Sequence, residues 1–258
     1  MRRLNQVRKD LNQEGRGLVS ELLYRGQGTA SWKLSTTLER RTGKDTFDAH
    51  DYFLAAEGIR PEIETFTEQK WRVLLDDFEK WEKDADILLL NSMPSLEYMI
   101  YLRHHGFPSP LLDWTKSPYV AAYFSYVDPP KDAAKVSVYA YVEWAGRGKT
   151  QVGDHPVIST LRPNSASHKR HFIQQSEYTI CAKRDGRRIK FTSHEYAFAK
   201  TEEGENLLWK LTLPRAERIH VLHTLDRMNV NAISLFAMED SLMETAALRV
   251  FDFANKDF

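Results

Sequence analysis

The spacing of apolar residues changes once along this chain, and that change limits the folds open to it. Helical spacing dominates positions 46–127, whereas the alternation typical of strands dominates positions 134–214. A doubly wound sheet would instead alternate strands and helices along its whole length. The pattern therefore predicts an α+β fold with a mixed or antiparallel sheet core and a helical insertion.

Three helices are predicted in the helical part. In the first, over 66–86, the apolar residues fall on one stripe at steps of three and four: Trp71, Leu74, Leu75, Phe78 and Trp81. The second runs over 94–105 and ends at Gly106. The third begins at Ser117-Pro118, where serine caps free amides and proline presets φ.

Strands are predicted on both sides of these helices. A buried strand over 18–24 ends at Arg25, and Asp185-Gly186 is typical of a hairpin turn. The later strands are expected at 136–144, 178–183, 189–198 (with a possible turn) and 207–213, followed by helices over 216–228 and from 239 onward. We expect a polar arm or helix over 1–17 and a single domain over 18–258.

Composition excludes several classes of protein. Lys+Arg and Asp+Glu both number 36, and this balance weighs against a non-specific nucleic-acid binder. The one cysteine, Cys181, excludes an internal disulfide and a multi-cysteine zinc site. No apolar run approaches the roughly 20 residues of a membrane span, and the first 17 residues lack the apolar core of a secretory signal. We therefore predict a cytoplasmic protein without membrane contact.

Two groups of side chains allow more than one interpretation. The histidine pairs His168/His171 and His220/His223 lack further ligands at suitable spacing, so no metal is expected. A basic cluster surrounds the predicted hairpin turn and consists of Lys183, Arg184, Arg187, Arg188 and Lys190. It is either a solvated hairpin tip or a surface that contacts the phosphates of a nucleotide or nucleic acid.

Three segments carry more specific patterns. They are Tyr24-Arg25-Gly26-Gln27 with Trp32, Leu34, Thr36 and Arg40; His104 to Phe124, which contains Leu111-Leu112-Asp113-Trp114-Thr115; and Arg170-His171-Phe172-Ile173-Gln174-Gln175. Together they resemble the FRG domain family over most of residues 20–240. That family continues its Gln-Gln pair with glycine and an apolar residue, whereas Ser176 and Glu177 follow here.

A more remote resemblance, to ADP-ribosyltransferases, rests on the order of three motifs. Those enzymes place Arg-Gly at the end of an early strand, then a Ser/Thr segment, then Gln-x-Glu at the start of a later strand. This chain has Arg25-Gly26, then Thr115 and Ser117, then Gln175-Ser176-Glu177. The resemblance implies a split sheet, NAD as substrate, and transfer of ADP-ribose to a protein or nucleic acid. A toxin or anti-phage defence effector would use such chemistry, and an inhibitory partner protein would suit it.

Within this resemblance each motif has an expected role. Cleavage of the nicotinamide–ribose bond builds positive charge on the ribose, which a carboxylate at Glu177 would stabilise. Arg25 would hold the phosphates, and Gly26 would let the dinucleotide approach the backbone. If both lie in a strand, Gln175 points to the same face as Glu177 and would orient the acceptor. The remaining expected nucleotide contacts are Gln27, His105, Thr115 and Ser117.

Structural interpretations of the same residues stay open. Arg25 would then pair with Asp113 or Glu177, and Glu177 would be an exposed carboxylate at a strand end. Trp114 would pack, while the side chains of Asp113 and Thr115 would bond local backbone before a helix. Three hypotheses follow: an ADP-ribosyltransferase, a non-catalytic module that binds a nucleotide or partner protein, and nucleic-acid binding through the basic cluster.

Overall fold

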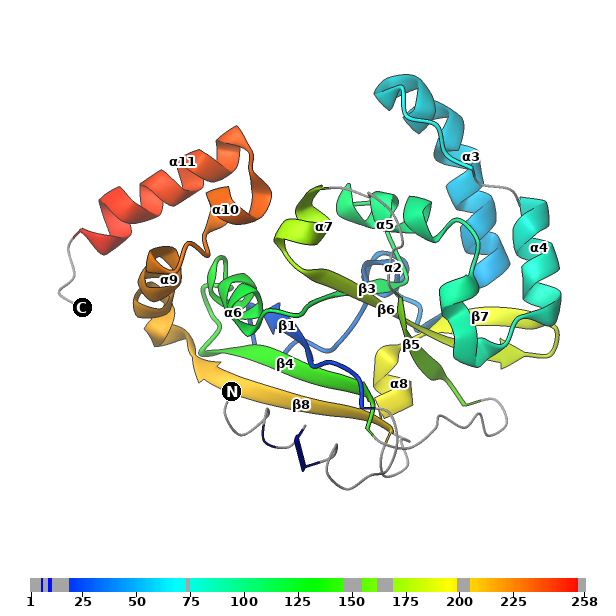
Figure 1. The fold of residues 1–258 in the computed structure, drawn as a ribbon, viewed down its shortest axis with the longest axis horizontal. Helices are drawn as coiled ribbons and strands as arrows, with labels where there is room; N and C mark the ends of the chain where they lie inside the picture. The colour runs from blue at the N-terminus through cyan, green and yellow to red at the C-terminus, as the bar shows by residue number, and fades with distance from the viewer. Residues whose placement is uncertain are drawn as a thin grey trace.

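The computed structural model describes residues 6, 9–10, 19–72, 75–145, 155–161, 169–198 and 205–254. Within these residues an eight-stranded antiparallel sheet forms the centre of the molecule (Figure 1). Its strands are β1 (Leu23–Gln27), β2 (Thr46–Asp48), β3 (Leu111–Thr115), β4 (Lys135–Trp144), β5 (Val157–Leu161), β6 (Ser176–Asp185), β7 (Arg188–Thr192) and β8 (Glu205–Pro214). Their order is β2-β7-β6-β3-β1-β4-β8, and β5 pairs with β6. The predicted α+β class with an antiparallel sheet core is confirmed.

The sheet parts along one seam near its middle. All five residues of β1 pair with β4, from Leu23 opposite Tyr141 to Gln27 opposite Ser137. Toward β3, by contrast, Tyr24 opposite Thr115 is the one pair found among the described strand residues. Because β1 keeps its register with β4, it diverges from β3 after Tyr24. The Arg25-Gly26-Gln27 segment therefore lies beside an opening in the sheet.

Helices cover both faces of this sheet. They are α2 (Thr37–Thr42), α3 (Ala49–Thr67), α4 (Leu75–Asp84), α5 (Leu96–His104), α6 (Pro118–Tyr126), α7 (Lys169–Ile173), α8 (His194–Phe198), α9 (Arg218–Arg227), α10 (Ala232–Phe236) and α11 (Glu239–Ala247). Short 3-10 helices span Ile87–Ser92 and Arg215–Glu217, and a π-helical segment spans Leu248–Phe253. None of the helices that the structure describes is long and apolar enough to cross a membrane.

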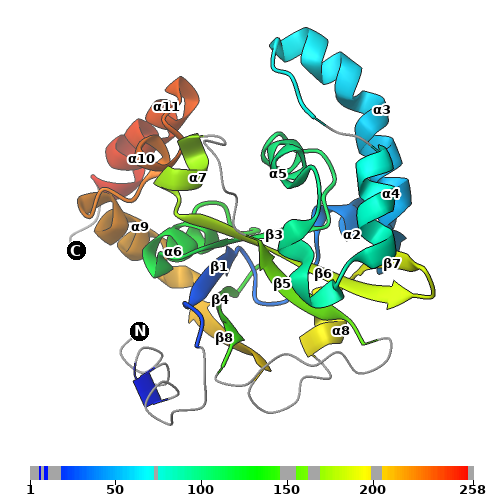
Figure 2. The ribbon, with the colours of Figure 1, turned by 45° about the vertical axis from the view of Figure 1, so that its right-hand side comes forward.

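Two apolar cores lie on the same side of the sheet, one on each side of the seam. Helices α3, α4 and α5 pack on β6 and β7 around buried Phe53, Phe78 and Tyr178. Helix α6 packs on β1 and against the C-terminal helices α9 and α10, around Tyr123 and Leu225. Figure 2 shows α6 beside β1 and α5 apart from it, above β3. Neither of these two cores crosses the seam, whereas a third cluster, on the opposite face, joins Leu23 of β1 to Leu112 and Trp114 of β3.

Several local predictions are confirmed, because each rests on a strong local signal. The second helix is α5, and Gly106 behind it has φ 86°, which favours glycine. Helix α6 begins at Pro118, and the Ser117 hydroxyl accepts from the Val120 amide at 3.3 Å. The Asp185-Gly186 turn joins β6 to β7, with Gly186 at φ 59°.

Other boundaries were predicted wrongly. The stripe over 66–86 is not one helix, because α3 ends at Thr67 and Glu68 takes a left-handed φ of 59° before α4 begins. Trp71 lies between the two helices, where its ring contacts Tyr98 and Tyr101. Periodicity alone does not register such a break, since apolar residues on either side of it still face the same core.

The predicted strands also shift. The first begins at Leu23 rather than at residue 18 and continues through Gln27, since pairing with β4 holds that segment extended. The strand expected over 189–198 ends at Thr192, and helix α8 follows. The Leu111–Thr115 segment, inside the part dominated by helices, is the central strand β3. Most of the predicted arm over 1–17 lies outside the described residues, and the single-domain prediction stays a prediction.

Candidate functional site

A cavity of about 610 Å³ lies at the seam between β1 and β3. Its wall takes backbone and side chains from β1 at Tyr24 to Gln27 and from β3 at Asp113 to Thr115. The loop after β1, the end of α5, one face of α6, the start of β6, and Arg170 with Phe236 from α7 and α10 complete it. The volume falls within the range of about 300–1,000 Å³ that small-molecule sites occupy.

Positive charge dominates the cavity wall. Among the described lining residues, the cationic side chains are Arg25, Lys33, Arg40, Arg103 and Arg170, and the carboxylates are Asp113 and Asp128. Five cations therefore face two anions, an excess of three charges in a chain whose formal net charge is zero. Such a local excess attracts an anion, because a concave wall focuses the field of its charges.

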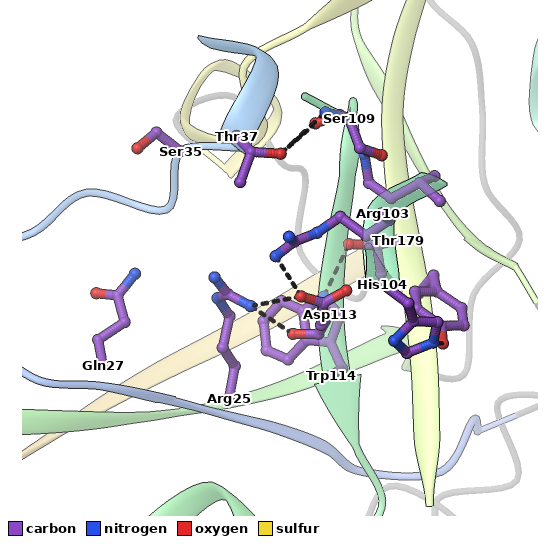
Figure 3. Close-up of polar contacts among 12 residues, drawn as sticks. Arg25, Gln27, Ser35, Thr37, Arg103, His104, Ser109, Asp113, Trp114 and Thr179 are labelled. Carbon is purple, nitrogen blue, oxygen red and sulfur yellow. Dashed lines mark hydrogen bonds and ion pairs between the residues drawn. The ribbon is translucent and has the colours of Figure 1, made fainter. Parts of the chain in front are cut away.

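Asp113 lies at the centre of this charge. Figure 3 shows the side chains of Arg25 and Arg103 converging on it from two sides. Arg25 Nη1 donates to the Asp113 carbonyl oxygen at 2.7 Å and lies 4.0 Å from Oδ2, and Arg103 Nη2 forms an ion pair with the same Oδ2. Of the two predicted structural partners of Arg25, the structure selects Asp113. The prediction that the Asp113 side chain bonds local backbone is wrong, because both arginines come from distant elements.

The arginine pair is not fully compensated by this single carboxylate. Burial lowers the pKa of Arg25 to about 10, and the charge of Arg103 acts in the same direction while Asp113 opposes it. Arg25 Nε, Arg103 Nε and Asp113 Oδ1 are buried without a hydrogen-bond partner among the described residues. Since buried polar groups are normally paired, these atoms leave hydrogen-bonding capacity beside the cavity.

Gly26 serves the packing of α6. A Cβ atom at this position would lie 2.0 Å from the Ala121 carbonyl oxygen and 2.7 Å from the Ser125 amide nitrogen. No side chain fits there, so glycine lets α6 lie directly on β1. Gly26 also lines the cavity, so the predicted approach of a ligand to its backbone stays a prediction.

Gln27, Thr115 and Ser117 differ in their relation to the cavity. Gln27 lines it, donates from Nε2 to the Lys33 carbonyl at 3.1 Å, and has a buried Oε1 without a described partner. Thr115 also lines it, but its hydroxyl donates to the Gln174 carbonyl at 2.6 Å and accepts from the Ser117 amide at 3.0 Å. Ser117 is not among the lining residues, since its hydroxyl caps α6.

Gln175 and Glu177 do not reach the cavity. The prediction that they share one strand face is wrong, because β6 begins at Ser176 and Gln175 precedes it with a left-handed φ of 49°. Within β6, Ser176 lines the cavity and Glu177 faces the opposite side of the sheet. There Glu177 is 5% exposed rather than solvated, and its Oε1 lies 2.9 Å from Lys116 Nζ.

His105 does not line the cavity either, whereas the preceding residue, His104, does. The His105 ring packs on Tyr101 with centroids 4.3 Å apart, and burial lowers its pKa. His104 lines the cavity, and its Nε2 lies 2.6 Å from the Tyr178 hydroxyl. His171 Nδ1 reaches the same hydroxyl at 3.3 Å.

Sequence reasoning gave no role to Lys33, Arg40, Arg103 and His104. Arg40 belongs to the first quoted motif, and His104 to the second, so a signal existed for both. Arg103 had none, since an arginine in the last turn of a helix is ordinary. Among the residues that the structure describes, no group of three or more His, Cys, Asp or Glu is arranged to hold a metal ion. His168 lies outside them.

The comparisons with known proteins agree with the first resemblance. The family model of the FRG domain matches residues 20–134, a shorter span than the predicted 20–240. No curated protein and no solved structure matched the chain. The match runs from three residues before β1 to the residue before β4, so it contains Arg25, Arg103 and Asp113 but not the Gln174-Gln175 pair. The chain therefore contains a match to the FRG domain over residues 20–134.

Proposed function

We propose that this FRG domain protein binds a phosphate-bearing nucleotide in the cavity at the seam, with NAD as the candidate ligand. The observation that carries the proposal is the excess of three positive charges on the wall of a cavity of about 610 Å³.

Arginine suits this ligand for a specific reason. Its guanidinium presents several donors in a planar fork that matches the oxygens of a phosphate. With a pKa of about 10, Arg25 keeps its charge at neutral pH despite burial. The partly buried wall also weakens solvent screening, which strengthens attraction between the arginines and an anion. Lys33 and Arg40, both exposed, extend the same charge toward solvent.

ADP-ribosyl transfer to a macromolecular acceptor would be the catalytic use of such a site. It requires a carboxylate beside the ribose, and Glu177 faces the other side of the sheet next to Lys116. Asp113 does line the cavity, but two arginines hold it. The geometry therefore supports nucleotide binding, the non-catalytic hypothesis, ahead of transfer.

Calorimetric titration with NAD, ADP-ribose and ADP tests the binding. We expect the double variant Lys33→Gln/Arg40→Gln to weaken binding roughly tenfold, since each exposed charge contributes up to about 1 kcal/mol. The matched control is Lys183→Gln/Arg187→Gln, which removes the same charge from the β6–β7 hairpin and should leave the affinity unchanged. No binding of any of the three ligands, or equal weakening in both double variants, would overturn the proposal.

A nicotinamide-release assay with cell lysate as acceptor then separates binding from transfer. Release by the wild type that is lost in Glu177→Gln, in a folded protein that still binds NAD, would establish transfer and require Glu177 to reach the ligand. Release lost in Asp113→Asn alone would assign the chemistry to the cavity carboxylate. Binding without release from any form is the result expected of a binding module.

A further inference from the structure

Trp32 is an exposed aromatic residue on the wall of the charged cavity. Its side chain lines the cavity, and the residue is 51% exposed. Among the described residues no ring contact to the Trp32 indole is found. Two other aromatic rings of the wall differ in this respect, since Phe124 and Phe236 pack edge to face on each other with centroids 6.1 Å apart.

The backbone around Trp32 is held on both sides. The Ala30 amide donates to the Lys135 carbonyl at 2.8 Å, and the Leu34 amide donates to Glu195 Oε1 at 2.9 Å. Leu34 itself is fully buried. The Trp32 carbonyl accepts from the Tyr139 hydroxyl at 3.4 Å. The exposed indole therefore belongs to a loop whose backbone is anchored beside the cavity.

An anchored indole beside cations is the arrangement that recognises a base joined to phosphate. Aromatic side chains bind bases by stacking on their π-faces, and each stack contributes to affinity for any base. Lys33 follows Trp32 directly, and Arg40 lies on the same cavity wall. A ligand with an aromatic ring and a phosphate could therefore use both parts of the wall at once, whereas a sugar phosphate could use one.

We propose that Trp32 is the platform on which the aromatic base of the ligand stacks, while the phosphates bind the arginines around Asp113. This inference rests on the proposed function and adds a ligand class to it. The site takes nucleotides and discriminates against sugar phosphates and inorganic phosphate. Trp32 contacts the ligand directly, so its removal affects the two kinds of ligand differently.

Two ligands that differ by the base alone make the test. AMP and ribose 5-phosphate carry the same sugar phosphate, and AMP adds adenine. We expect AMP to bind the wild type roughly tenfold more tightly than ribose 5-phosphate. Trp32→Ala should weaken the binding of AMP by a similar factor and leave the affinity for ribose 5-phosphate unchanged. Trp32→Phe should keep most of the AMP affinity, because phenylalanine retains a stacking face.

Tryptophan fluorescence supplies a second readout that a purely structural role would not move. AMP should quench the emission of the wild type, and the quenching should be smaller in Trp32→Phe at AMP concentrations that saturate it, with Trp114 on the same cavity wall as the source of any remainder. Equal affinity of the two ligands for the wild type, or equal weakening of both by Trp32→Ala, would overturn the platform while leaving the phosphate site intact. If NAD and both test ligands fail to bind, the proposed function fails with it.

Discussion

The molecule gathers cationic side chains in two places, and their surroundings differ. In the hairpin of β6 and β7 five of them stand close together in the sequence, from Lys183 to Lys190. In the cavity five others come together from positions as distant as Arg25 and Arg170. The first group is visible on the printed sequence, and the second exists only after folding.

The hairpin cations are largely engaged by the protein itself. Arg184 donates to the carbonyls of Glu82 and Ala85 at 3.2 and 2.7 Å, and Arg188 Nη1 reaches Glu82 Oε2 at 3.3 Å. Lys190 pairs with Asp185 at 2.5 Å. Since Glu82 is 5% exposed, its charge needs such partners, so the cluster fastens the hairpin to α4. This favours the structural interpretation of the basic cluster over nucleic-acid binding.

The comparison teaches that the density of charge along a sequence is a weak guide to a binding site. Both groups set five cations against two carboxylates, so what distinguishes the cavity is its concave wall together with buried polar atoms that lack partners. Four experiments sharpen or break the contrast between the two regions.

The largest effect on stability is expected when a methyl group is added at Gly26, and the same change in the hairpin serves as its control. Gly26→Ala would place Cβ 2.0 Å from the Ala121 carbonyl oxygen, so α6 must move away from β1. We expect a loss of about 3 kcal/mol in the free energy of unfolding, measured in urea. Gly186→Ala is the control, because the added atom meets nothing within 4 Å there and the cost is about 1 kcal/mol for its left-handed φ. Similar losses in both variants would contradict the close packing of α6 on β1.

The next largest effect is expected on the loss of stability in acid, which should depend on His194 and not on the hairpin. Burial, with a smaller contribution from the charge of Arg25, lowers the pKa of His194 behind the cavity from 6.5 to about 3. Below pH 6.5 His194 is therefore protonated in the unfolded chain but stays neutral in the folded one, so stability is lost as the pH falls. Between pH 7 and pH 5 this costs about 2 kcal/mol.

The variant His194→Gln tests this, because glutamine keeps an acceptor for the hydroxyl of Thr179, which lies 2.9 Å from His194 Nε2. Urea unfolding at pH 7 and pH 5 should show about 2 kcal/mol less acid loss in the variant than in the wild type. In the hairpin, the hydrogen bond from Lys190 lowers the pKa of Asp185 below 3.8. Asp185→Asn should therefore leave the change between pH 7 and pH 5 unaltered. An unchanged acid loss in His194→Gln would show that other groups carry it.

Removal of the cavity carboxylate should have a smaller effect, which we expect on ligand affinity and not on stability. In Asp113→Asn the charges of Arg25 and Arg103 lose their counter-charge, so we expect ADP to bind roughly fivefold more tightly, about 1 kcal/mol. Calorimetry measures the change, and Asp185→Asn in the hairpin serves as the matched control without effect. Weaker binding in Asp113→Asn would mean that Asp113 orients the arginines rather than competing with the ligand.

The smallest effect is expected at the hairpin tip. Arg187 is exposed, so Arg187→Gln should change the free energy of unfolding by less than about 0.5 kcal/mol. Binding of duplex DNA, measured at 50 and 200 mM salt, should be the same in variant and wild type. A steep salt dependence that disappears in Arg187→Gln would instead restore the nucleic-acid hypothesis.

Prediction of the fold succeeded where a local signal decides the structure. Ser117-Pro118 starts α6 and Asp185-Gly186 turns β6 into β7, because capping and turn geometry involve neighbours in the sequence. It failed at Leu111–Thr115, whose place as a central strand depends on β1 and β6, and at Trp71, whose ring packs on a helix that follows later.

Prediction of the site followed the same division. The motifs identified Arg25, Gly26, Gln27 and Thr115, all of which line the cavity. They also indicated Glu177, but alternation within β6 turns its side chain away, and Gln175 precedes β6 with a left-handed φ, so the two side chains do not share a strand face. Which carboxylate faces an arginine depends on strand register, and register is set by pairing between distant segments.

The order of residues along this chain was therefore sufficient for the α+β class, for several helix and turn boundaries, and for the family resemblance, since each depends on side chains within a few positions of one another. Folding was needed to bring Arg25, Arg103 and Asp113 together, to expose Trp32 on the same wall, and to pair Glu177 with Lys116 on the opposite face. Charges from separate elements interact through space, and their balance arises only when the sheet opens between β1 and β3.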